Sequence, residues 1–336
     1  MTRSPGPLLT SLGSAPLPSL GSASSRRVVA LGGGHGLAAT LQALRRVTSS
    51  ITAVVGVSDD GGSSGRLRSE FGVLPPGDLR MALAALCGDD AWGRTWERVV
   101  QHRFGGEGQL AGHSLGNLLI TALWEQTGDP VTGLDWVAAL LEANGRVLPC
   151  SEVPLTIVAD VLGHDPAQPD EVTVVRGQVE VATTPGDVLH IALDPPEPPA
   201  CREALTAVKE ADAIVLGPGS WYTSVIPHLV IPELARAIAE SPARRIVVLN
   251  LNPQVGETSG FAAHTYLDVL YNYLPDLRVD TVIADRHHVE DMDALRRSCA
   301  DLGADIFLMD VSRSAPDSAG MHDPQRLAVA FDTVLA

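Results

Sequence analysis

The chain has 336 residues, a formal net charge of −16, and 45% hydrophobic against 19% charged residues, which is the composition of a globular protein. The acidic excess excludes a broad surface for nucleic acid or for an anionic membrane, because binding there needs clustered cations. No apolar run is long enough to span a membrane. The four cysteines are too scattered for a metal knuckle or a redox pair, so we expect reduced core residues in a cytoplasmic protein.

The first 25 residues differ in composition from the rest of the chain. They are rich in Ser, Pro, Gly and Leu, and the sequence Ser-Leu-Gly-Ser-Ala occurs at residues 11–15 and again at 19–23. A signal peptide is the alternative, but four prolines and Gly13 break any continuous apolar helix. We expect residues 1–25 to be a disordered extension, followed by a single domain at residues 26–336.

From residue 26 onward, strand patterns alternate with helix patterns. Runs of Val, Ile and Leu predict strands at residues 27–31, 51–57, 213–217, 245–251, 280–284 and 305–311. Apolar periodicity predicts helices at residues 37–46, 78–87, 113–126, 232–240, 261–273 and 324–334. Strands that are apolar throughout are buried on both faces. The sequence therefore predicts an α/β fold with a Rossmann-like, doubly wound, mostly parallel sheet and ligands at the carboxyl ends of its strands.

One region interrupts this alternation. Residues 78–143 predict mostly helices, and residues 146–194 predict short strands, including 171–176 and 179–182. We expect residues 78–194 to form an insertion that covers the sheet and does not fold as a separate domain.

A glycine-rich turn, Gly32-Gly33-Gly34-His35-Gly36, directly follows the first predicted strand. Such a turn leaves unpaired backbone N–H groups at the start of a helix, where the helix dipole also favours an anion. Any tight turn between a strand and a helix uses glycine as well, and the spacing departs from the dinucleotide-binding fingerprint. The turn alone leaves phosphate binding and a purely structural role open.

The turn after the second strand is much more polar. It reads Asp59-Asp60-Gly61-Gly62-Ser63-Ser64-Gly65-Arg66. Carboxylate, hydroxyl and guanidinium groups side by side suit a metal-bridged phosphate or a ribose. The two turns together predict a phosphate site, at which Asp59 and Asp60 would contact either a metal-bridged phosphate or a ribose.

Further polar clusters open predicted helices or follow predicted strands, and we expect them to share one cleft with the two turns. For Asp78 and for the segment from His113 to Asn117, helix capping is the alternative role. His113 is the candidate for proton transfer, although the sequence shows no partner for it. The predicted ligand-binding residues are Gly33, Gly34, His35, Gly36, Asp60, Gly61, Gly62, Ser63, Ser64, Asp78, Arg80, His113, Ser114, Asn117, Gly217, Pro218, Gly219, Ser220, Thr223, Ser224, Asn250, Glu257 and Thr258.

These turns, together with Pro75-Pro76-Gly77-Asp78, Gln101-His102-Arg103-Phe104, Gly112-His113-Ser114-Leu115-Gly116-Asn117, Gly217-Pro218-Gly219-Ser220 and Gly256-Glu257-Thr258, carry a resemblance that spans residues 27–335. The chain resembles the YvcK family of gluconeogenesis factors, which is related to the CofD phospholactate transferases. The resemblance implies a Rossmann-like cytoplasmic protein that binds UDP-sugars, notably UDP-N-acetylglucosamine, and influences cell shape and wall synthesis during gluconeogenic growth. We also expect a homo-oligomer and a downstream protein partner that the sequence does not identify.

The chain departs from the family pattern at two positions. His35 stands where the family usually has threonine, which removes a hydroxyl that could contact a phosphate, and the imidazole either replaces that hydroxyl or blocks the turn. Met321 occupies a position that is often basic in relatives, and the loss of that charge is expected to weaken pyrophosphate binding.

Three functional hypotheses follow from the sequence. A regulatory nucleotide-sugar binder is favoured, because no activated nucleophile with a paired base is visible. In a CofD-like transferase, Asp59 and Asp60 would hold Mg²⁺ on a nucleotide diphosphate while an acceptor hydroxyl attacks phosphorus and His113 takes its proton. An NAD-linked dehydrogenase is disfavoured by the glycine spacing.

Overall fold

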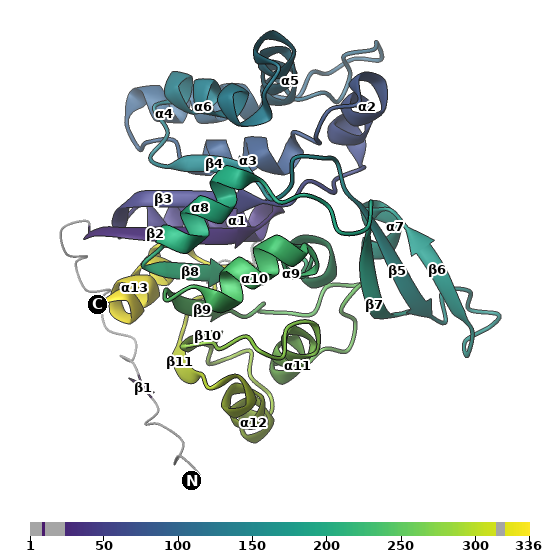
Figure 1. Ribbon diagram of the computed structural model, residues 1–336, viewed down its shortest axis with the longest axis vertical. Helices are drawn as coiled ribbons and strands as arrows, with labels where there is room; N and C mark the ends of the chain where they lie inside the picture. Colours follow the sequence, from purple (N-terminus) through teal and green to yellow (C-terminus); the bar gives the residue numbers. More distant parts are fainter. Residues whose placement is uncertain (1–8, 11–23, 314–319) are drawn as a thin grey trace.

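The computed structural model describes residues 9–10, 24–313 and 320–336 (Figure 1). Its centre is a parallel eight-stranded sheet in the order β1-β11-β10-β9-β8-β2-β3-β4. The strands are β1 (Leu9–Thr10), β2 (Ser24–Gly32), β3 (Thr48–Val55), β4 (Arg146–Pro149), β8 (Ala213–Leu216), β9 (Arg244–Val248), β10 (Thr281–Asp285) and β11 (Asp305–Met309).

The chain winds outward from the centre of this sheet in both directions. From β2 it proceeds to β3 and β4 on one side, and later from β8 to β9, β10 and β11 on the other. The topological switch point therefore lies between β2 and β8, where doubly wound folds bind their ligands. The glycine turns that follow β2 and β8 both lie at this point.

Helices cover both faces of the sheet. On one face α1 (Gly34–Leu44) packs against α3 (Gly77–Ala85) and α13 (Pro324–Leu335). The opposite face carries α8, which packs against α10, together with α9, α11 and α12 (Figure 1). Their bounds are α8 (Arg202–Glu210), α9 (Pro227–Val230), α10 (Pro232–Glu240), α11 (Ala263–Tyr273) and α12 (Met292–Leu302), and a five-residue π-helix, η1 (Trp221–Val225), precedes α9.

Two further groups of elements extend the molecule beyond the sheet. The helices α2, α4, α5 and α6 form a layer next to α3 and β4 at the top of Figure 1. A separate antiparallel sheet, in the order β6-β5-β7, projects to the side with α7 against it (Figure 1). The bounds are α2 (Gly62–Phe71), α4 (Ala91–Gln101), α5 (Leu115–Thr127), α6 (Pro130–Leu141), β5 (Thr156–Leu162), β6 (Val172–Arg176), α7 (Gln178–Ala182) and β7 (Asp187–Asp194).

The predicted fold class is confirmed, and every position of β10 is buried, as expected for a strand covered on both faces. The strand predicted at residues 179–182 is wrong, because these residues form α7. Residues 146–149 were expected in the insertion but form β4 of the central sheet.

Four of the six predicted strands extend too far at their carboxyl ends, whereas β2 and β10 each continue one residue beyond the prediction. Val57, Leu249 and Val311 are buried, yet they follow the last paired residues of β3, β9 and β11. An apolar run reports burial, which continues into the loops above the sheet, and it does not report hydrogen bonding to a neighbouring strand.

The start of the domain differs slightly from the prediction as well. Ser24 and Ser25 already belong to β2, so the sheet begins within the expected extension. Leu9 and Thr10 pair with β11, and the remainder of the extension, residues 1–8 and 11–23, lies outside the described residues.

The four cysteines are buried and free, in agreement with their expected place in the core. Within the described ranges, no helix combines the length and the apolar character that crossing a bilayer requires.

Candidate functional site

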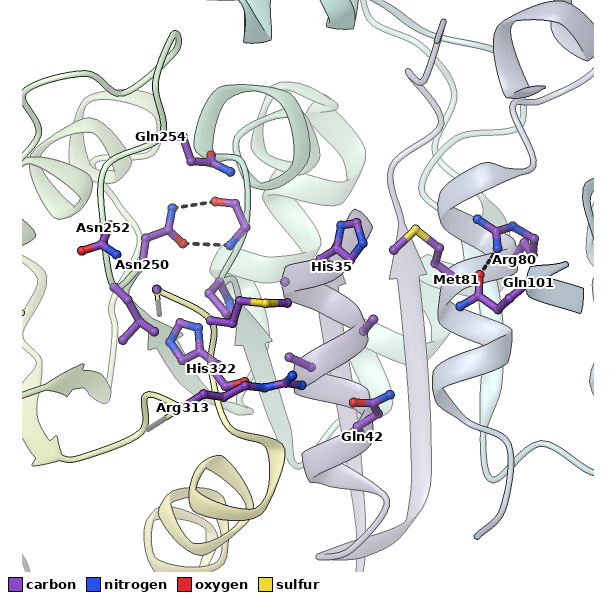
Figure 2. A pocket seen from close by; sticks show the side chains of 18 of the residues that line it. His35, Gln42, Arg80, Met81, Gln101, Asn250, Asn252, Gln254, Arg313 and His322 are labelled. Atoms are coloured by element: carbon purple, nitrogen blue, oxygen red, sulfur yellow. Dashed lines mark hydrogen bonds between the residues drawn. The ribbon is translucent and has the colours of Figure 1, made fainter. Parts of the chain in front are cut away.

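A cavity of about 480 Å³ opens at the topological switch point. The first glycine turn and α3 form one side, and the segments that follow β8, β9 and β11 form the other (Figure 2). The lining residues are His35, Gly36, Ala38, Ala39, Gln42, Arg80, Met81, Gln101, Arg103, Pro218, Gly219, Asn250, Leu251, Asn252, Gln254, Arg313, Gly320, Met321 and His322.

The lining of this cavity is cationic. Arg80, Arg103 and Arg313 contribute guanidinium groups, and none of the described residues that line it is acidic. This composition contrasts with that of the whole chain, in which 40 acidic residues outnumber 24 basic ones. Burial, together with the neighbouring Arg103, lowers the pKa of Arg80 to about 10, so an anion placed here would relieve repulsion.

The first glycine turn supplies backbone donors to the same cavity. Gly33 precedes α1 in an extended conformation, and Gly34 has φ +57°, a conformation that favours glycine. The N–H groups of His35 and Gly36 have no hydrogen-bond partner among the described residues. Two unpaired N–H groups at the start of an eleven-residue helix are suited to a phosphate.

Gly36 is required because two turns meet there. A Cβ atom at this position would lie 2.1 Å from the carbonyl oxygen of Pro218 and 2.7 Å from the Cα of Gly219. The first and third glycine turns therefore touch backbone to backbone, as the prediction of a shared cleft required.

Two carboxylates lie on the other side of the first turn. A Cβ at Gly33 would lie 2.4 Å from Asp78 Oδ2, and one at Gly77 would lie 2.7 Å from Asp59 Oδ2. Burial and the neighbouring Asp59 raise the pKa of Asp78 to about 7, although the N–H of Gly34 lowers it in part. A cation between the two carboxylates would offset this repulsion.

The second predicted metal ligand, Asp60, faces elsewhere. Its carboxylate accepts hydrogen bonds from the N–H groups of Gln178 (3.0 Å) and Val179 (3.1 Å) and so caps α7. This contact explains why residues 179–182 are helical. Asp78 therefore lies at the first glycine turn with Asp59 near it, and Asp60 joins the second turn to the small antiparallel sheet.

The two carboxylates do not form a complete metal centre by themselves. No group of three or more His, Cys, Asp or Glu side chains in the described parts of the chain is arranged to hold a metal ion. Mg²⁺ commonly binds through one or two carboxylates and completes its shell with phosphate oxygens and water. Asp59 and Asp78 therefore fit a metal that arrives with a phosphorylated ligand.

Ser63, Asn117 and His113 form a hydrogen-bonded network behind Arg80. Asn117 Oδ1 accepts from Arg80 Nε (2.9 Å), and Asn117 Nδ2 donates to Ser63 Oγ (3.0 Å). Ser63 Oγ also lies 2.9 Å from His113 Nδ1, and Gln101 accepts a hydrogen bond from Arg80. The network fixes the guanidinium at the edge of the cavity.

The partner of His113, which the sequence did not reveal, is thus Ser63. Burial and the positive charge of Arg66 lower the pKa of His113, so its imidazole is neutral at physiological pH. Ser63 and His113 are both buried, and neither lines the cavity. Ser114 occupies the N-cap position of α5, but its hydroxyl makes no capping hydrogen bond.

In the third glycine turn the protein itself occupies the backbone groups. Asn250 Oδ1 accepts from the N–H of Gly219 (2.9 Å), and Asn250 Nδ2 donates to its carbonyl (2.8 Å). Glu257 is buried beside η1, and neither of its carboxylate oxygens makes a hydrogen bond of normal geometry. Burial raises the pKa of Glu257 to about 7, while nearby Thr223 and Ser220 lower it in part.

Other predicted residues near this turn lie outside the cavity and contact only the protein itself. Thr258 Oγ1 accepts a hydrogen bond from the N–H of Gln254, which closes a turn. Thr223 and Ser224 are buried in η1, and neither lines the cavity.

Two sets of predicted residues lie at the cavity or next to it, and the other ten belong to neither set: Asp60, Gly61, Gly62, Ser114, Gly217, Ser220, Thr223, Ser224, Glu257 and Thr258. The first set lines the cavity and has six members, namely His35, Gly36, Arg80, Pro218, Gly219 and Asn250. A second set lies directly behind the lining residues and is linked to them by the contacts described above: Gly33, Gly34, Ser63, Asp78, His113 and Asn117. Ser64 belongs to this set as well, because a Cβ atom added at Gly77 would lie 2.3 Å from its Oγ.

Seven polar lining residues were not among the predicted site residues: Gln42, Gln101, Arg103, Asn252, Gln254, Arg313 and His322. Gln101 and Arg103 belong to a motif that carries the family resemblance, which was the available signal for them. Arg313 and His322 follow the last strand of the sheet, and the available signal for His322 was the adjacent Met321, where the chain departs from the family pattern.

These features define a doubly wound α/β protein with an arginine-lined cavity at its switch point. The family model "2-phospho-L-lactate transferase CofD" matches residues 28–315, and the chain belongs to the CofD family.

Relatives within this family confirm the resemblance to the gluconeogenesis factors. The chain is 51% identical over 312 residues to a "Putative gluconeogenesis factor" of Mycobacterium tuberculosis, which covers 92% of this chain and 90% of that protein. It is 37% identical over 266 residues to a "Gluconeogenesis factor" of Halalkalibacterium halodurans, which covers 79% of each. A crystal structure of a UPF0052 family member from Bacillus halodurans has a TM-score of 0.80 at 31% identity, and the match covers 92% of this chain and 99% of that one.

Proposed function

We propose that this protein is a cytoplasmic regulatory factor that binds a nucleotide sugar of the UDP-N-acetylglucosamine type and is needed for cell shape and wall synthesis during gluconeogenic growth. The cavity carries this proposal. It combines two unpaired N–H groups at the start of α1 with three arginines and no described acidic residue. These are the donors that a diphosphate requires.

The remaining lining supports a ligand with neutral polar parts. Gln42, Gln101, Asn250, Asn252 and Gln254 line the cavity with side-chain amides. Amides both donate and accept hydrogen bonds, so they suit a base or a sugar. A volume of about 480 Å³ lies within the range of small-molecule sites.

Binding without turnover is the better supported role. A catalytic hydroxyl and its base must reach the reacting atoms. Ser63 and His113 form the one hydroxyl–imidazole contact in the network behind the cavity, and both are buried away from it. The output of such a binder is a changed surface for a protein partner, reached when the ligand shifts the population of conformers.

A second candidate is a metal-dependent phospho-group transferase, in keeping with the name of the family model. The facing carboxylates of Asp59 and Asp78 support it, since they would hold Mg²⁺ beside a diphosphate at the first glycine turn. The ion would neutralise charge that develops on the transferred group. Under either hypothesis, Asp59→Asn and Asp78→Asn should abolish any effect of Mg²⁺ on ligand affinity, while Asp60→Asn should leave it.

One titration separates the candidates. Purified protein is titrated with UDP-N-acetylglucosamine with and without Mg²⁺, and the mixture is then analysed by mass spectrometry. Saturable binding of a ligand that stays intact supports the regulatory factor. A cleaved ligand or a transferred phospho-group supports the transferase, and the lack of saturable binding in both conditions contradicts the proposal.

A further inference from the structure

One wall of the cavity carries two hydrogen-bonding atoms without partners. Gln254 Oε1 and His322 Nε2 are buried, and neither has a hydrogen-bond partner among the described residues. Both side chains belong to the wall formed by residues 250–254 and 320–322, opposite Arg80 and Gln101 (Figure 2). Buried polar atoms without partners are rare because each costs roughly 1–3 kcal/mol, so this pair requires an explanation.

The position of His322 is fixed by its backbone and not by its ring. The N–H of Arg313 donates to the carbonyl of Met321 (2.9 Å), and that of Asp323 donates to the carbonyl of Val311 (2.8 Å). Arg313 Nε also donates to the carbonyl of His322 (3.2 Å). The residue is only 8% exposed, so the ring is held at the cavity wall before any ligand arrives.

The imidazole of His322 is neutral. Burial, with a smaller contribution from His288, lowers its pKa to about 4, although Asp285 and the carbonyl of Leu249 oppose this shift. Asp285 is itself saturated, because its carboxylate accepts from the N–H groups of His287, Val311 and Ser312.

A neutral imidazole carries one N–H. Because Nε2 has no hydrogen-bond partner and the carbonyl of Leu249 interacts with the ring, we assign the proton to Nδ1. Nε2 is then an acceptor, as Gln254 Oε1 is. The wall at residues 254 and 322 thus offers acceptors, whereas the opposite side offers the donors of α1 and Arg80.

We propose that the cavity orients its ligand by this polarity: the anionic part lies at α1 and Arg80, and a neutral head group donates hydrogen bonds to His322 Nε2 and Gln254 Oε1. His322 is then a specificity-determining residue for a donor-bearing head group. The inference rests on the proposed function, because it assigns the two ends of a nucleotide sugar to the two sides of the cavity. Donors of this kind are the imide N–H of uracil and the hydroxyls of ribose or of the sugar.

The test compares probes with and without a head group. Wild type, His322→Leu, His322→Gln and Gln254→Leu are titrated with UDP, CDP and inorganic pyrophosphate. Leucine removes the acceptor, whereas glutamine keeps an acceptor oxygen. We expect His322→Leu and Gln254→Leu each to lose roughly tenfold in affinity for UDP, with pyrophosphate affinity unchanged and His322→Gln close to wild type.

The two sources of the donor give different results with CDP, because cytosine has an acceptor in place of the imide N–H of uracil. A uracil donor predicts that wild type prefers UDP and that His322→Leu removes the preference. A hydroxyl donor predicts equal losses for UDP and CDP. Both results support the proposal.

Two other results overturn it. If both leucine variants bind UDP as wild type does, or lose UDP and pyrophosphate equally, the orientation is wrong while the proposed function stands. If wild type binds neither UDP nor pyrophosphate, the proposed function and the orientation both fail. Gln254→Leu keeps the test decisive if His322→Leu does not fold.

Discussion

The first and third glycine turns follow neighbouring strands, β2 and β8, yet they present opposite surfaces to a ligand. After β2, an eleven-residue helix begins with the N–H groups of His35 and Gly36 unpaired and facing the cavity. After β8, both backbone groups of Gly219 are taken by Asn250, and the helix that follows is a five-residue π-helix beside the buried Glu257. One turn is open to an anion, and the other has its own side chains in that place.

A glycine turn after a strand is therefore not sufficient to create a phosphate site. Glycine permits the backbone path, but the available N–H groups decide whether an anion can bind. The third turn instead supports the first, because Pro218 lies against Gly36. Substitutions at the contact between the turns, at the buried carboxylate of Glu257 and at Arg80 in the cavity test this difference.

Gly36→Ala should have the largest effect. The added methyl group would lie 2.1 Å from the Pro218 carbonyl oxygen, so the two turns must separate. We expect the free energy of unfolding to fall by about 3 kcal/mol or more, as for severe overpacking, with loss of ligand binding. Urea unfolding measures the first effect and titration the second. Gly105→Ala, where the methyl group meets no atom within 4 Å, is the matched control, and equal stability of the two variants would contradict the close contact.

Glu257→Gln tests the occupied turn through pH. The pKa of Glu257 is about 7 in the folded protein and near 4.3 when unfolded, so folding favours the protonated form. The contribution of protonated Glu257 to the free energy of unfolding is therefore fully present below about pH 4 and is lost as the pH rises through 7. Glutamine removes this cost, which is about 3.5 kcal/mol at pH 8 and about 1 kcal/mol at pH 5.

Urea unfolding of Glu257→Gln at both pH values checks this expectation. The exposed Glu125→Gln serves as control and should change neither value. A gain in stability of the same size at pH 5 and pH 8 would show that ionisation of Glu257 is not its source.

Arg80→Met should weaken ligand binding at the open turn roughly 100-fold, or about 2.7 kcal/mol, because it removes a charge-assisted contact from the cavity. Methionine keeps an apolar stem but leaves the oxygens of Asn117 and Gln101 without their donor. Thermal unfolding must therefore accompany the titration. Arg27→Met, a change at the start of the sheet beside Glu210 and Asp212, should leave affinity intact. Equal affinities of the two variants would remove Arg80 from the site.

Much of the fold was readable in the sequence because it depends on local pattern. Continuous apolar runs predicted the central strands, and the helix predicted at residues 232–240 has those bounds in the structure. The prediction failed at α7, where the valines of residues 179–181 favour a strand but Asp60, more than a hundred residues away, caps a helix. Local propensity cannot anticipate such a distant cap.

The site was readable only where glycines and polar turns mark strand ends. His35, Gly36 and Asn250 were found in this way. Arg313 and His322 were missed because backbone pairing after β11 brings them to the cavity, although the neighbouring Met321 was singled out as a departure from the family pattern. Asp60 was expected beside Asp59 at the ligand, but its carboxylate accepts hydrogen bonds from α7. The sequence gives the neighbours of Asp60 along the chain, but not the direction in which its carboxylate points.

Met321→Arg should give the smallest effect, a gain in ligand affinity. Met321 lines the cavity and is 42% exposed, and the family resemblance places a basic residue at this position in many relatives. A guanidinium here would add a fourth cation to the open side of the site, but its exposure to solvent limits the gain to about 1 kcal/mol, or roughly fivefold in affinity for UDP. The gain should shrink as salt rises from 0.05 to about 0.5 M, because an exposed charge is screened over roughly 10 Å at 0.1 M. Met321→Leu keeps the apolar side chain and should bind as wild type does. A gain in affinity that persists at high salt would come from packing of the new side chain and not from its charge. Ligand affinity at this side of the cavity would then depend less on charge than on the shape that the first glycine turn imposes.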